Sequence, residues 1–95
     1  MSELGPETLE VILREAFGGT DAERRVVVRQ ARDLADSGKH DADRGFPLTV
    51  DELLDHLGDA PADCTVPERW NWWLGSLEVA YGGYREFQVQ AVERE

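Results

Sequence analysis

Apolar residues recur every three or four positions in four stretches of the chain, the spacing of one buried face of an α-helix. Each stretch ends at a glycine, which readily adopts the left-handed conformation that follows a helix. The pattern predicts helices from Pro6 to Phe17, from Thr20 to about Ser37, from Thr49 to Leu57, and from Val66 to the glycine pair at 82–83. The polar, glycine-bearing stretch 39–47 is predicted to be a loop.

Three of these helices begin with a threonine followed three residues later by a glutamate. This is the capping-box pattern, in which each side chain bonds the free backbone N–H of the other residue. The pairs are Thr20 with Glu23, Thr49 with Glu52, and Thr65 with Glu68. Agreement between caps and periodicity is the strongest support for the helix assignments.

After the last helix, apolar and polar residues alternate from Tyr84 to Val92, which predicts a short β-strand. The sequence therefore predicts a mainly α fold, a compact bundle of about four short helices with a C-terminal strand. Residues 1–95 are expected to form a single small domain.

The helix that begins at Val66 is apolar on two sides. One stripe is expected to face the core and contains Trp70, Trp73, Leu74, Leu77, Ala80 and Tyr81. Trp72 and Val79 project to nearly the opposite side. Either the other helices cover Trp72 within the domain, or this second side contacts a protein partner, because aromatic residues concentrate at interaction hot spots. Phe87 and Val89 are further candidates for that contact.

Twenty acidic residues face ten basic ones, and the net charge is −10. Abundant acid, a single lysine and short aliphatic side chains resemble the proteins of salt-in halophiles, haloarchaea in particular. No long apolar run and no basic start followed by an apolar stretch is present, so no membrane contact is expected and the predicted location is the cytoplasm.

Candidate chemistry is weak. Asp41, Asp43 and Glu52 match three positions of a calcium loop, but Gly45 and Phe46 stand where a ligand and the turn glycine belong. The two histidines have no standard metal spacing, and the lone cysteine excludes an intrachain disulfide. No catalytic, metal or cofactor site is predicted, and the protein is expected not to be an enzyme.

Arg25, Arg29 and Arg32 share one stripe of the second helix. They have two interpretations, a grip on phosphate or a solvated face. The solvated face is favoured, because Asp21 precedes Arg25 by four residues and Asp36 follows Arg32 by four.

The stretch LTVDELLDHLG, Leu48 to Gly58, resembles the first helix of the helix-turn-helix in winged-helix transcription regulators. The resemblance implies that the tryptophan helix is the recognition helix, with Arg69 and Asn71 towards DNA bases, and that 84–92 begins the wing. The connection from Asp59 to Val66 is longer than the tight turn usual in that family. A net charge of −10 also opposes binding to phosphates.

The leading functional hypothesis is a non-enzymatic adaptor that acts through protein–protein contact, most simply as a homodimer through its second tryptophan face. The alternative hypothesis is a winged-helix-like DNA-binding regulator. The two differ in which residues of the tryptophan helix meet the partner: Trp72 and Val79 in the first, Arg69 and Asn71 in the second.

The charge predicts that folding depends on salt. Molar KCl shortens the range of repulsion between carboxylates to about 3 Å, whereas repulsion in dilute buffer acts against the compact state. We expect circular dichroism to show a folded helical chain in multimolar KCl and an unfolded one in dilute buffer. Equal melting temperatures in the two solutions would contradict the halophilic interpretation.

Overall fold

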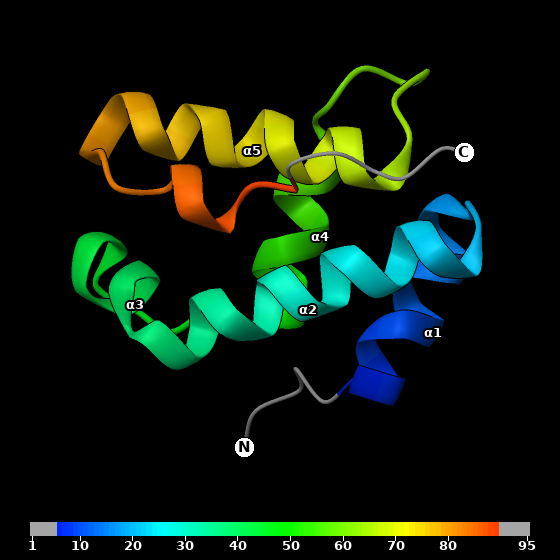
Figure 1. Cartoon of the computed structure of the whole chain (residues 1–95), viewed down its shortest axis with the longest axis horizontal. Coiled ribbons are helices and arrows are strands. Elements are labelled where there is room, and N and C mark those ends of the chain that lie inside the picture. Colours follow the sequence, from blue (N-terminus) through cyan, green and yellow to red (C-terminus); the bar gives the residue numbers. More distant parts are fainter. Residues whose placement is uncertain (1–5, 90–95) are drawn as a thin grey trace.

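The computed structural model describes residues 6–89, and over that range it contains five α-helices and one 3₁₀-helix (Figure 1). The helices are α1 (Pro6–Phe17), α2 (Asp21–Ser37), α3 (Lys39–Arg44), α4 (Val50–Gly58), α5 (Val66–Tyr81) and the 3₁₀-helix η1 (Arg85–Phe87). In Figure 1, α5 crosses the top of the molecule, α2 crosses below it with η1 between them, and α4 passes behind α2. The predicted mainly α bundle is confirmed.

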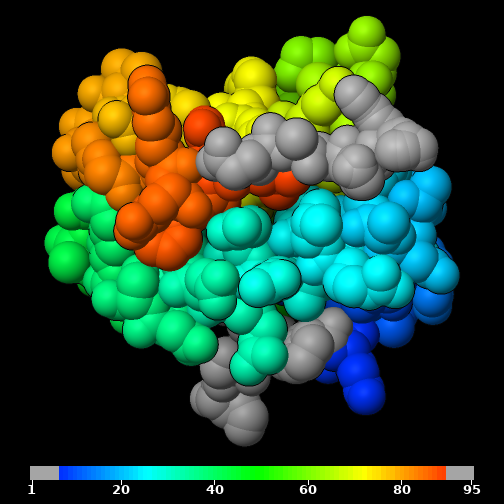
Figure 2. Space-filling view, in the orientation of Figure 1, coloured from blue at the N-terminus to red at the C-terminus, as the bar shows by residue number. Residues whose placement is uncertain are grey.

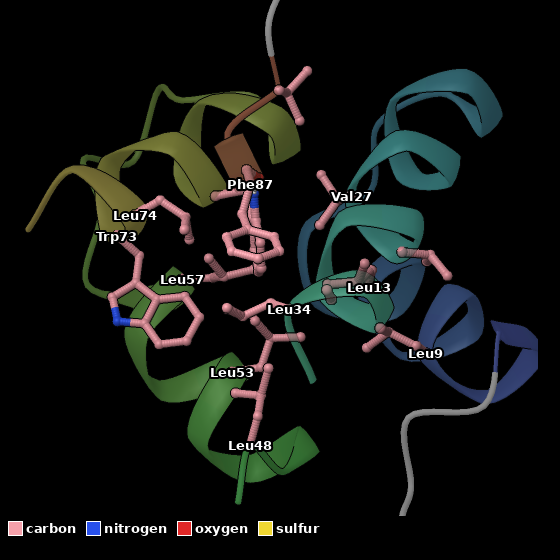
Figure 3. Packing of buried hydrophobic residues seen from close by; sticks show 14 of the residues in the cluster. Leu9, Leu13, Val27, Leu34, Leu48, Leu53, Leu57, Trp73, Leu74 and Phe87 are labelled. Carbon is pink, nitrogen blue, oxygen red and sulfur yellow. Dashed lines mark hydrogen bonds between the residues drawn. The ribbon is translucent and has the colours of Figure 1, made fainter. Parts of the chain in front are cut away.

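One cluster of buried apolar side chains joins all of the helices except α3. Figure 3 shows Leu34 of α2, Leu57 of α4 and Phe87 of η1 meeting at its centre, with Trp73 to one side. On α5 the predicted core stripe is buried at Trp70, Trp73, Leu74 and Leu77. The prediction was wrong for Ala80 and Tyr81, which are exposed, because the last turn of α5 lies at the edge of the molecule (Figure 1).

The predicted loop at 39–47 contains the short helix α3 over its first six residues, so that prediction was wrong for 39–44. Gly38, with φ 76°, ends α2 and redirects the chain before α3 begins. His40 is the buried residue of this helix, and Lys39 and Asp43 form an ion pair one turn apart. A helix that buries one histidine and no aliphatic residue leaves no apolar periodicity for sequence analysis to detect.

The predicted strand at 84–92 is also corrected where the structure describes it. Residues 85–87 form η1, and no β-strand occurs anywhere in 6–89. The apolar residues that suggested alternation, Phe87 and Val89, are buried, but side chains of α5 rather than a neighbouring strand bond their backbone. The remainder of the predicted strand, 90–92, lies outside the described residues.

A buried arginine fixes the turn between α1 and α2. Arg24 is only 3% exposed. Its Nε donates to Glu10 at 2.7 Å, and Nη1 donates to the carbonyl oxygens of Gly18 at 3.0 Å and Gly19 at 2.6 Å. Its Nη2 pairs with Asp21 in the first turn of α2. One guanidinium therefore ties the body of α1, the glycine turn and the start of α2 together.

We expect Arg24→Met to lower the free energy of unfolding by about 3 kcal/mol, because it removes the hydrogen bond to Glu10, which keeps only Arg14, and leaves two carbonyl groups without their donor. The neighbouring exposed residue supplies a matched control, Arg25→Met, for which we expect a change within about 0.5 kcal/mol. Chemical denaturation of both variants in the same salt measures the difference. Equal midpoints for the two variants would show that the guanidinium does not hold the turn.

Candidate interaction surface

Four consecutive residues of α5, Trp70 to Trp73, read W-N-W-W and point in four directions, since successive helical residues are about 100° apart. Trp70 is fully buried and meets Trp73 edge to face, with ring centroids 5.7 Å apart. Its indole N–H donates to the carbonyl oxygen of Phe87 at 2.8 Å. Trp70 thus joins the core and also holds the segment that follows α5.

Asn71 bonds both backbone polar groups of Val89. Its Nδ2 donates to the Val89 carbonyl oxygen at 2.9 Å, and its Oδ1 accepts from the Val89 N–H at 2.8 Å. A side-chain amide here does what a paired strand does for an extended backbone. Trp70 and Asn71 together clamp residues 87–89 against α5.

Trp73 faces inward between two histidines. The His56 ring stacks on it with centroids 4.8 Å apart and an interplanar angle of 8°, and His40 approaches edge-on at 6.0 Å. Trp73 is 1% exposed. Its position closes the core where α3, α4 and α5 meet.

Trp72 is the member of the tetrapeptide that turns outward. It is 44% exposed, and Val79, two turns further along the same side of α5, is 88% exposed. Ser76 and the half-buried Gly75 lie between them. We call these four residues, Trp72, Gly75, Ser76 and Val79, the outer α5 face. The other helices therefore leave Trp72 partly uncovered.

Phe87 and Val89, the other two predicted interface residues, do not reach this surface. They are 7% and 8% exposed and belong to the core cluster. The structure thus brings Trp72 and Val79 together on one exposed side and places Phe87 and Val89 inside the same chain. The outer α5 face is smaller than the sequence suggested.

The two predicted DNA-contact residues are engaged within the chain. Arg69 donates from Nη1 to the carbonyl oxygen of Leu57 at 3.0 Å and from Nη2 to that of Ala62 at 3.3 Å. Its guanidinium also lies 4.6 Å from the centroid of the Phe17 ring. Asn71 is occupied by Val89. Both residues therefore have structural partners, and DNA binding through them stays a prediction.

Behind Trp73, a set of polar side chains connects α3 to α4. Glu52 accepts from Arg44 at 3.1 Å and its carboxylate lies 2.6 Å from His56 Nε2. This is why the predicted third capping box is only half formed: Thr49 accepts from the Glu52 N–H, while the Glu52 side chain turns to α3 and His56. The boxes at Thr20 and Thr65 are complete, as predicted.

His40 is fully buried, with Nδ1 3.2 Å from the Phe46 carbonyl oxygen and Nε2 without a hydrogen-bond partner among the described residues. Burial lowers the pKa of His40 below its ordinary value of 6.5, and the nearby Arg44 lowers it further. Asp41 and Glu52 act in the opposite direction but more weakly. The neutral imidazole is the form that this site favours.

The residues of the calcium-loop pattern are separated by their pairings. Asp43 accepts from Lys39 and from the Tyr84 hydroxyl, both at 2.9 Å, and these bonds hold the pKa of Asp43 below its usual range. Burial and Asp43 raise the pKa of Tyr84. Glu52 is taken by Arg44 and His56. Over residues 6–89 no group of three or more histidine, cysteine or carboxylate side chains is placed to hold a metal ion.

A family model described as the WNWW domain matches residues 1–78, and the chain therefore belongs to that family. The four letters of the family's name are the residues at 70–73. Neither a curated protein nor a solved structure matches the chain. In the described part of the chain, every helix is too short or too polar to cross a membrane.

The buried histidine predicts a pH dependence of stability. Because the pKa of His40 is lower in the folded chain than in the unfolded one, the unfolded chain binds the proton more tightly. Stability is therefore lost as the pH falls below about 6.5, and the titration of His40 leaves stability unchanged above that value. We expect thermal melts to show this loss between about pH 7 and about pH 5.

His40→Gln removes the titrating group and should flatten the difference over that range. The lowered pKa of Asp43 acts only below its usual value of 3.8 and does not overlap this window. A His40→Gln variant whose melting temperature falls with pH as steeply as that of the natural chain would contradict the assignment.

Proposed function

We propose that this member of the WNWW domain family is a non-enzymatic adaptor that acts through protein–protein contact, and that the outer α5 face binds a second copy of the chain. The proposal rests on the different environments of the four residues of the tetrapeptide. Trp70, Asn71 and Trp73 are each committed to contacts inside the chain. Trp72 is the member of the tetrapeptide whose large apolar side chain is left partly in water.

The spacing of the outer α5 face supports a second copy as the occupant. In an antiparallel pair of α5 helices with a two-fold axis between positions 75 and 76, Trp72 of one copy lies opposite Val79 of the other. At 1.5 Å per residue, both are about 5 Å from the axis. Such a contact is self-complementary, as a two-fold interface requires. Ser76, a small exposed residue, lies at the crossing beside the half-buried Gly75, next to which the Gln88 side-chain amide of the same chain lies.

The charge of the chain sets the conditions for pairing. Two copies with a net charge of −10 each repel one another in dilute buffer, and salt screens that repulsion. The outer α5 face consists of four residues, far fewer than the roughly 20–30 a side of a standard interface, so a weak, salt-dependent pair is expected. We further propose that the protein resides in the cytoplasm of a salt-accumulating cell, where ionic strength favours the pair.

We expect light scattering in multimolar KCl to give a dimer that Trp72→Ala or Val79→Ala converts to a monomer, with a dissociation constant raised at least about tenfold. Val11→Ala is the matched control, because Val11 is also exposed but lies on α1. A monomer at all concentrations of the natural chain, in high and low salt, would refute self-association. A sequence-selective complex with duplex DNA under those conditions would favour the winged-helix alternative instead.

Cross-linking tests the register of the same proposal. Cys64 is the single cysteine of the chain, so the Cys64→Ser variant has none. Adding Ser76→Cys to that variant introduces one thiol near the proposed axis. Mild oxidation should give a disulfide-linked dimer for Ser76→Cys. The exposed α3 variant Ala42→Cys should give little. Equal yields from the two positions would exclude the antiparallel arrangement.

A further inference from the structure

Three arginines on the exposed side of α2 have no acidic partner within the described residues. Arg25, Arg29 and Arg32 are exposed, and no carboxylate of residues 6–89 lies within 4.0 Å of their guanidinium nitrogens. Along the helix axis Arg29 lies about 6 Å and Arg32 about 10.5 Å from Arg25. We call these residues the α2 arginine stripe.

The sequence had suggested that nearby aspartates neutralise this stripe, and the structure corrects that expectation. Asp21, expected to pair with Arg25, pairs instead with the buried Arg24. Asp36 lies one turn beyond Arg32 without reaching its guanidinium. The buried clamp at the start of α2 therefore takes the carboxylate that would have neutralised the exposed side.

A shallow groove accompanies the stripe. Between α1 and α2 it has a volume of about 520 Å³, and its lining includes Val11, which is 38% exposed, together with Val28, Arg14 and Arg25. A second hollow of about 310 Å³ continues along α2 past Val28, Arg29 and Arg32. In Figure 2, α2 (cyan) runs across the middle of the visible face with α1 (blue) at its lower edge. Arginine side chains and carboxylates thus line the two hollows around the exposed Val11 and the buried Val28.

We infer that this groove and the α2 arginine stripe bind an acidic amphipathic helix of a partner protein. Carboxylates spaced i, i+4 and i+7 on such a helix repeat the spacing of Arg25, Arg29 and Arg32, and guanidinium groups form paired hydrogen bonds with carboxylates. Apolar residues on the adjacent side of the same helix would cover the exposed Val11, which lies beside the buried Val28. Helix-in-groove recognition uses this combination of periodic apolar and charged contacts.

A partner of mixed character suits the surface better than a continuous polyanion does. Glu7, Glu10 and Asp21 also line the first groove, and Asp33 and Asp36 line the second. A nucleic acid has a negative charge at every phosphate, so it would meet these carboxylates and the overall charge of −10. A protein helix meets the arginines with a few carboxylates and can place neutral or basic residues opposite the acidic rim.

The test measures fluorescence anisotropy of a labelled helical peptide with glutamates at i, i+4 and i+7 beside a leucine stripe, added to the full chain. The variant Arg25→Gln/Arg29→Gln/Arg32→Gln should weaken binding at least about tenfold. Its matched control is Ala42→Glu/Ala62→Glu/Ala80→Glu, which changes three exposed residues elsewhere and likewise takes the net charge from −10 to −13. The control should change binding by less than about threefold.

Three further measurements decide the outcome. Val11→Ser should weaken binding, because it removes apolar contact from the groove floor, and a peptide of the same composition with scattered glutamates should bind more weakly than the periodic one. Equal binding of the two peptides, or equal effects of the arginine variant and its control, would overturn the inference. Tighter binding of a short DNA duplex than of the periodic peptide would also overturn it and assign the stripe to phosphate.

Discussion

Burial of Trp70 and Trp73 on one side of α5 is the constraint on which the rest of the structure depends. Two indole rings need more cover than a single helix supplies. The His56 ring of α4 stacks on Trp73, and His40 of α3 contacts the same indole ring edge-on. The segment after α5 returns to place Phe87 in the core and is held there by the Trp70 indole. Each of these elements contacts one of the two tryptophans, which are 0% and 1% exposed.

That constraint also explains which parts of the fold were visible in the sequence. α1, α2, α4 and α5 bury aliphatic or aromatic residues at helical spacing and have recognisable caps, so both signals agree. α3 buries a histidine, and its polar composition is that of a loop. Phe87 and Val89 alternate with a polar residue as in a strand, but 85–87 form η1 and Asn71 supplies the hydrogen bonds of the Val89 backbone. No local pattern reveals that a side chain eighteen residues earlier will do so.

The candidate surfaces show the same limit. Periodicity alone separated Trp72 and Val79 from the core stripe, because the geometry of a helix fixes which residues share a side. It could not place Phe87, Val89, Arg69 or Asn71, whose positions depend on contacts with distant parts of the chain. It also could not foresee Arg24, since five consecutive positions from Ala22 to Val26 include two arginines, a glutamate and no sign of which charge is buried. The pairing of Asp21 follows from that burial.

The positive charges of the chain fall into those paired within the fold and those left open on its surface. In a chain with ten basic residues, Arg24, Arg44, Arg69 and Lys39 are engaged by carboxylates, carbonyl groups or aromatic rings within the fold. The α2 arginine stripe is not so engaged, and it lies on a different helix from the outer α5 face. Pairing through α5 would therefore leave both α2 stripes open, and a dimer would present two copies of the cationic groove. Two linked sites bind a partner with repeated acidic helices more tightly than one site does, because the second contact becomes intramolecular. An adaptor built in this way would need neither a cofactor nor a catalytic group to bring such partners together.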